Sequence, residues 1–142
     1  MKTIIPVFAL ALALGYGCSS GGSDSVANTP VDLSGTSLGV AVVTWGTAYP
    51  KNASYPIVFD LVQSGSTVTG GYSTAATAQA TSGTVAGTIS GQTFSFTLTE
   101  NLPCSGSFTG STTVASSGIS FSGPYSGADC SGTTEAWLSV SK

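Results

Sequence analysis

The sequence contains no histidine, and only three of its 142 residues are Lys or Arg, against six that are Asp or Glu. The lack of histidine removes the usual general base and the commonest metal ligand. The few carboxylates are scattered along the chain, which makes most hydrolytic mechanisms hard to assemble. We therefore expect a protein that is not an enzyme and that carries no metal and no other cofactor.

Charge of either sign is scarce, and this also limits the partners. With a net charge of −3, the chain has little with which to neutralise phosphates or anionic lipid headgroups, so nucleic acid is excluded as a partner. Hydrophobic residues nevertheless make up 41% of the sequence, so the low charge does not indicate disorder. The length allows one small domain plus a targeting segment.

The first 17 residues have the layout of a secretory signal. Lys2 supplies a positive start, and the apolar run from Ile4 to Leu14 is followed by small residues before Cys18. The run is too short to span a bilayer, because a spanning helix needs roughly 20 apolar residues. We therefore predict a signal peptide over residues 1–17.

The block from Leu14 to Cys18, Leu-Gly-Tyr-Gly-Cys, resembles the lipobox of bacterial lipoproteins. In that family the aliphatic residue usually stands three positions before the cysteine, where this chain has Gly15. The resemblance implies cleavage before Cys18 and a membrane anchor through lipid on that cysteine. Ser19 implies, by the same resemblance, the outer membrane of a bacterial cell envelope. The alternative is ordinary cleavage that releases a soluble secreted domain.

The three cysteines are consistent with the lipid. A Ser/Gly-rich stretch follows Cys18, and we predict a lipidated cysteine with a flexible linker over residues 18–37. Folding the predicted hairpin of the sixth and seventh strands brings Cys104 and Cys130 nearly opposite each other, which favours a structural disulfide over a redox or metal site. Lipid on Cys18 then accounts for the odd cysteine.

From Leu38 onward, apolar residues recur at every second position between Gly/Ser turns, as in half-buried antiparallel strands. Strands are predicted at 38–45, 55–63, 67–72, 81–90, 92–99, 104–114, 118–126 and 135–141. The predicted inward residues are Ile57, Phe59, Leu61, Val68, Tyr72, Val85, Ile89, Phe94, Phe96, Leu98, Phe108, Ile119, Phe121, Tyr125, Leu138 and Val140.

These strands predict an all-β domain over residues 38–142. Eight strands joined by short links favour a closed antiparallel up-and-down barrel, and the runner-up is a two-sheet sandwich. The second, fourth and sixth links are tight turns, whereas the others are longer and run over 46–54, 73–80, 100–103 and 127–134. Alternate links emerge at opposite ends, so we predict a tight-turn end, which the tether enters, and a long-loop end that faces away from the membrane.

The first long link is the richest in aromatic residues. Trp45, Tyr49, Asn52 and Tyr55 combine aromatic faces with amide and hydroxyl groups, which suits an apolar or sugar-like ligand. The alternative is that Trp45 and Tyr55 only plug the barrel end. Four acids could also bind a cation or act in acid/base chemistry, but we interpret them as solvated surface groups; they are Asp60, Glu100, Asp129 and Glu135.

Glycine recurs between apolar residues in several strands, as in Val68/Gly70/Tyr72 and Phe121/Gly123/Tyr125. One interpretation is that glycine permits sharp curvature in a narrow barrel, and the other is a lumen left partly empty for a ligand. Pro124 cannot donate to a neighbouring strand, which favours a bulge or an imperfect closure there.

The stretch from Phe59 to Tyr72 resembles a hairpin of avidin-like and lipocalin-like barrels. The resemblance implies an eight-stranded barrel that binds a small molecule at its open end. We therefore expect a lipid-anchored binding module for a small apolar or sugar-like ligand. The alternatives are a protein-facing role, as an envelope component or enzyme inhibitor, and a structural surface lipoprotein.

Overall fold

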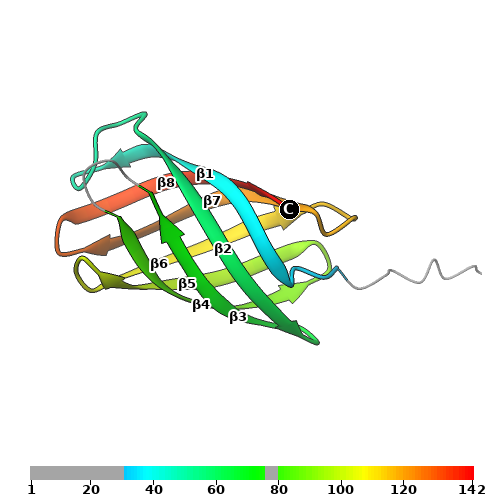
Figure 1. Ribbon diagram of the computed structural model, residues 1–142. Coiled ribbons are helices and arrows are strands. Elements are labelled where there is room, and N and C mark those ends of the chain that lie inside the picture. Colours follow the sequence, from blue (N-terminus) through cyan, green and yellow to red (C-terminus); the bar gives the residue numbers. More distant parts are fainter. Residues whose placement is uncertain (1–30, 76–79) are drawn as a thin grey trace, which may run out of the picture.

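Eight antiparallel strands close into one barrel in the computed structural model, which describes residues 31–75 and 80–142 (Figure 1). The strands follow sequence order around the barrel, and β1 pairs with β8 to close it. Their bounds are β1 Gly35–Gly46, β2 Ser54–Ser64, β3 Thr67–Thr74, β4 Thr81–Ser90, β5 Thr93–Leu102, β6 Gly106–Val114, β7 Ser120–Asp129 and β8 Gly132–Ser141. The predicted fold class is confirmed, and the sandwich is excluded.

Side chains alternate between the two faces of each strand, so the predicted row of apolar residues points into the barrel. Of the predicted inward residues, all are buried except Ile89 and Tyr125, which are partly buried against the core, and Ile119. The prediction for Ile119 was wrong, because β7 begins only at Ser120 and the Ile119 side chain is 57% exposed in the preceding turn. Four Phe rings fill the half of the barrel nearer the tight-turn end, at centroid distances of 5.1–5.7 Å: Phe59, Phe94, Phe96 and Phe121.

The strand glycines lie where neighbouring groups approach closely. A Cβ on Gly70 would overlap the backbone oxygen of Asp60 on β2, and a Cβ on Gly110 would overlap the Phe96 ring. The space beside these glycines is therefore already filled by backbone and by a ring. This favours the interpretation that glycine permits tight coiling over the one in which it leaves the lumen empty.

The segment Val31–Ser34, which precedes β1, closes the tight-turn end. Leu33 is 1% exposed and belongs to the core, and its backbone N–H donates to Gln63 Oε1 at 2.9 Å. Gln63 Nε2 donates in turn to the carbonyl of Val31 at 2.7 Å. The last residues of the predicted linker thus belong to the barrel, and β1 starts three residues before the predicted Leu38. The predicted signal peptide and Cys18 lie outside the described residues.

Two register shifts turn side chains away from their expected faces. One lies between Val43 and Trp45 in the pairing of β1 with β8, and the other lies at Ser82/Gly83, opposite the end of β5. Each shift gives one strand an extra residue, in β1 at the first and in β5 at the second, so that inward and outward positions are exchanged beyond it. Trp45 is consequently 57% exposed, and Leu102 also points outward.

Of the two alternatives predicted at Pro124, the bulge is not present, and an interruption of the β6–β7 ladder is. The β6 and β7 ladder keeps one register on both sides of it, but the pairs opposite Gly123 and Pro124 are missing. The missing Pro N–H thus interrupts the ladder without bending the strand out of register. The link predicted at 127–134 is also wrong, since β7 runs to Asp129 and β8 begins at Gly132, and the β6–β7 link, predicted to be a tight turn, is longer than both the β5–β6 and the β7–β8 links.

A disulfide joins Cys104 and Cys130 at the long-loop end, with a Cα–Cα distance of 5.9 Å. It links the β5–β6 connection to the β7–β8 turn. The predicted cysteine pairing is therefore confirmed. Within 31–75 and 80–142, no helix is long and apolar enough to cross a membrane.

Candidate ligand-binding site

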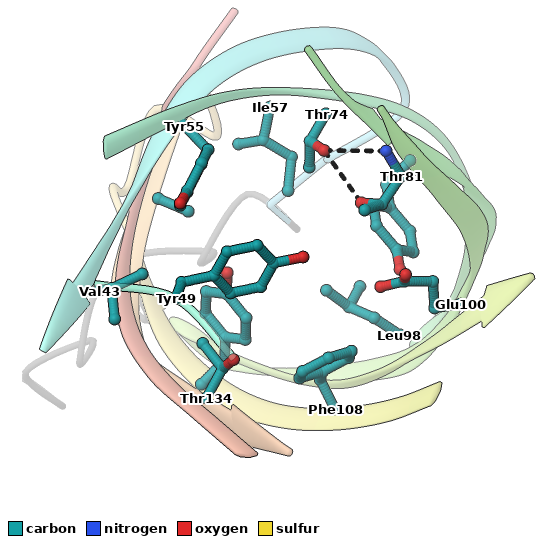
Figure 2. A pocket seen from close by; sticks show the side chains of 13 residues that line it. Val43, Tyr49, Tyr55, Ile57, Thr74, Thr81, Leu98, Glu100, Phe108 and Thr134 are labelled. Carbon is teal, nitrogen blue, oxygen red and sulfur yellow. Dashed lines mark hydrogen bonds between the residues drawn. The ribbon is translucent and has the colours of Figure 1, made fainter. Parts of the chain in front are cut away.

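A cavity of about 50 Å³ lies inside the barrel at the long-loop end (Figure 2). Every strand contributes to its wall, and the β1–β2 loop adds one residue. Its thirteen lining residues are Ala41, Val43, Tyr49, Tyr55, Ile57, Tyr72, Thr74, Thr81, Leu98, Glu100, Phe108, Tyr125 and Thr134. The cavity therefore lies at the long-loop end, next to the aromatic-rich link that was predicted to suit a ligand.

Five aromatic rings form much of the cavity wall. Tyr49 and Tyr55 meet edge to face with centroids 5.1 Å apart, and Phe108 meets Tyr125 in the same way at 6.2 Å. Tyr72 on β3 completes the set. Figure 2 shows Tyr49 reaching from its loop across the cavity, with its hydroxyl directed toward the side that carries Glu100. Such a wall offers both apolar ring faces and hydroxyl groups.

Three buried polar atoms of the cavity have no hydrogen-bond partner. They are the Tyr72 hydroxyl, Glu100 Oε1 and Thr134 Oγ1, and no other buried side-chain oxygen or nitrogen in the described residues is in this state. Their residues are 4–6% exposed. The first two atoms lie beside each other, outside good hydrogen-bond geometry, and Thr134 Oγ1 stands apart from them (Figure 2). An unpaired buried polar group costs about 1–3 kcal/mol, so each of these atoms favours a polar occupant of the cavity. A water or a polar ligand in the cavity would pair them.

The Glu100 carboxyl is the one ionisable acid in the cavity wall. Burial, followed by the nearby Asp129 carboxylate, raises the pKa of Glu100 to about 7, and the adjacent Tyr72 hydroxyl opposes this shift. Burial likewise raises the pKa of Tyr125 to about 12 and raises that of Tyr72 further. The acid can thus change its protonation state near neutral pH while these two tyrosines stay neutral.

Two of the four predicted ligand residues line the cavity. Tyr49 and Tyr55 do so, whereas Trp45 is turned outward by the register shift in β1. Asn52 is exposed and holds the β1–β2 turn with a positive φ of 66°, its N–H donating to the Val43 carbonyl at 2.8 Å. The structure therefore brings together the two tyrosines and leaves Trp45 and Asn52 outside the cavity.

The interpretation of Glu100 as a solvated surface acid was wrong. Glu100 follows Phe94, Phe96 and Leu98 at even positions of β5, so it continues the inward row into the cavity. The predicted strand ended at Thr99, one residue too early to include it. Extending the alternation by one residue would have found this acid.

The other predicted acids are not in the cavity wall. Asp60 and Glu135 are exposed, and Asp60 accepts a hydrogen bond from the Thr36 hydroxyl. Asp129 caps the β7–β8 turn by accepting from the N–H of Ser131 at 2.7 Å. Ligand-type atoms of Glu100, Asp129 and Cys104 lie within 4.8 Å of one another, but the sulfur is in the disulfide and is no thiolate ligand.

No protein-family model, no curated protein and no solved structure matches this chain.

Proposed function

We propose that this chain is an exported, lipid-anchored β-barrel that binds a small ligand in the cavity at its long-loop end. The observation that carries the proposal is a cavity whose largely apolar and aromatic wall contains three buried polar groups with unsatisfied atoms, those of Tyr72, Glu100 and Thr134. Binding sites commonly combine apolar walls with a few placed polar groups. The ligand has a small apolar or sugar-like body that enters the barrel and polar groups that pair these atoms.

The construction of the barrel supports a site at this end. Val31–Ser34 and the Phe rings fill the opposite end, so a ligand has one end from which to enter. The disulfide between Cys104 and Cys130 fixes two connections beside the cavity. A non-enzymatic role fits as well, because the Asp129 carboxylate near Glu100 is engaged with the turn backbone and does not line the cavity.

The test of binding uses the chain labelled with ¹⁵N and a panel of small neutral and charged compounds, including simple sugars. We expect one class of compound to shift the amide signals of Tyr49, Tyr72 and Thr134 in a saturable way. Thr134→Val removes one unpartnered oxygen with little change in shape and should alter the affinity. Thr109→Val, on the exposed face of β6, is the matched control. A panel that produces no saturable shift at the cavity would refute the proposal.

The proposed lipid anchor places the tether at the tight-turn end, where β1 begins, so the cavity would point away from an outer membrane. The measurement is the intact mass of the protein extracted from membranes, beside a Cys18→Ala control. Cleavage before Cys18 with added acyl chains, lost in the control, is the expected result. An unlipidated mass would make this a secreted domain and would remove the argument for its orientation.

A second candidate, a protein-facing role, rests on a different surface. Leu38, Val40 and Val42 of β1 and Trp137 of β8 are exposed on the outside of the barrel, and Val42 lies opposite Trp137 in the ladder. Exposed apolar patches commonly mark protein interfaces. A photo-crosslinking residue at Val40 should give a discrete adduct with a second protein in intact cells, whereas one at Thr109 should not. Equal labelling from both positions would refute this role.

A further inference from the structure

Within residues 31–75 and 80–142, the buried Glu100 carboxyl has no basic partner. No Lys or Arg is among the lining residues of the cavity. Lys51 is exposed on the β1–β2 loop, and Lys142 donates to the Asp32 carbonyl near the tight-turn end at 2.8 Å. A buried acid is usually paired with a positive group. Glu100 can be neutralised by a proton, and when it is ionised a positive group would come from a ligand.

The remainder of the wall also suits a positive charge. The aromatic rings of Tyr49, Tyr55, Tyr72, Phe108 and Tyr125 surround the same space as Glu100. The face of an aromatic ring attracts a cation, and Lys-like ammonium groups are among the cations bound in this way. A neutral sugar or alkane would gain nothing from the carboxylate charge.

The unpartnered Glu100 oxygen and the volume narrow the class of cation. Glu100 Oε1 can accept a hydrogen bond from the N–H donors of a primary ammonium group, whereas a quaternary ammonium has no such donor. The cavity of about 50 Å³ is also small beside the roughly 150 Å³ that accommodates benzene in an apolar protein cavity. A primary amine at the end of a short aliphatic chain meets both conditions.

We infer that the cavity binds the protonated amino group of a small primary aliphatic amine, with Glu100 as its ionic partner and the tyrosine rings as its walls. The inference rests on the proposed binding function and specifies its ligand class. Tyr49 is the lining residue that lies on a loop and not on a strand. It is therefore the wall that can move to admit the amine without breaking a strand ladder.

The pH dependence of binding follows from the groups around Glu100. Those that titrate are Asp129, Tyr49, Tyr55, Tyr72 and Tyr125. Burial raises the pKa of Tyr49, Tyr72 and Tyr125, and an aliphatic amine, like lysine with a pKa near 10.4, stays charged below pH 8. Between pH 6 and 8 the main change is the ionisation of Glu100, so amine affinity should rise about tenfold over this range, following the ionised fraction.

The experiment compares propylammonium with its neutral counterpart propan-1-ol, and with tetramethylammonium, by NMR titration of the full chain. We expect propylammonium to bind about tenfold more tightly than propan-1-ol at pH 8, which is the range for an ion pair with ring contacts. Glu100→Gln should abolish that advantage and the pH dependence while leaving propan-1-ol unaffected. Tyr49→Leu should weaken propylammonium several-fold, and Trp45→Leu, outside the cavity, should not.

Each outcome separates this inference from the proposed function. Equal binding of propylammonium and propan-1-ol, with no effect of Glu100→Gln, would overturn the amine assignment and leave the binding function intact. Tighter binding of tetramethylammonium would overturn the assignment to primary amines. The absence of any binding by the two cations would overturn it as well, and saturable shifts from a neutral compound of the broader panel would then preserve the binding function alone.

Discussion

Replacing Glu100 by Gln tests the electrostatics of the cavity without any ligand. Glutamine keeps the shape of the side chain but cannot ionise. In the native protein the pKa of Glu100 is raised from 4.5 to about 7, so between these values the folded state holds a proton that the unfolded chain has released. Folding stability contributed by that proton is fully present below pH 4.5 and is lost as the pH rises through 7. Raising the pH should therefore destabilise the native barrel more than the variant.

The magnitude follows from the same pKa values. A rise in the Glu100 pKa from 4.5 to about 7 corresponds to at most about 3 kcal/mol of unfolding free energy. Solvent that reaches the cavity through the loop end reduces this contribution to the order of 1–2 kcal/mol. Urea unfolding at pH 5.5 and pH 8, followed by tryptophan fluorescence, measures it. The native protein should lose about 0.5–1 kcal/mol relative to Glu100→Gln between these pH values, because part of the effect is already lost below pH 5.5.

The matched control is Glu135→Gln, which alters an exposed acid on β8. This variant should lose stability between pH 5.5 and pH 8 in parallel with the native protein. If the native protein and Glu100→Gln respond to pH alike, the carboxyl is not held in the environment that the cavity describes. The proposal that Glu100 pairs with a cationic ligand would then lose its support.

Three further changes test the framework around the cavity. Removing the disulfide with Cys104→Ser and Cys130→Ser together should cost about 3 kcal/mol in urea unfolding, given a separation of 26 residues, and unchanged stability would show that the bridge does not constrain the unfolded chain. Gly70→Ala should destabilise the barrel by more than about 2 kcal/mol, because its Cβ meets the β2 backbone. Gly71→Ala should be tolerated, because the atom nearest to its Cβ is 3.6 Å away. Similar melting temperatures of the two variants would contradict this packing. Leu33→Ala should cost about 2–4 kcal/mol in the same unfolding assay, while a loss below 0.5 kcal/mol would mean that Val31–Ser34 does not seal the barrel.

The alternation of apolar residues was sufficient to predict the strands, their order and most of the core, because each strand has one buried face. It could not predict the register shift that turns Trp45 outward, since a bulge depends on the partner strand. Tyr49 lies on a loop, where no period relates sequence to direction. Val31 and Leu33 alternate with polar residues, but this pair is too short to predict a core segment ahead of β1. The alternation in β5 could have predicted that Glu100 points inward, but a carboxylate at an inward position contradicts the expectation that acids face water.

The seal formed by Leu33 also determines how the barrel responds to tension. A pull on the chain ahead of Val31 first meets the contacts of Leu33 and the hydrogen bonds to Gln63. Beyond them it loads β1, which is paired on one side with β2 and on the other with β8. The load then runs along these two ladders, so many hydrogen bonds resist it together instead of parting one by one. The cavity at the far end would keep its shape under a force that this end absorbs.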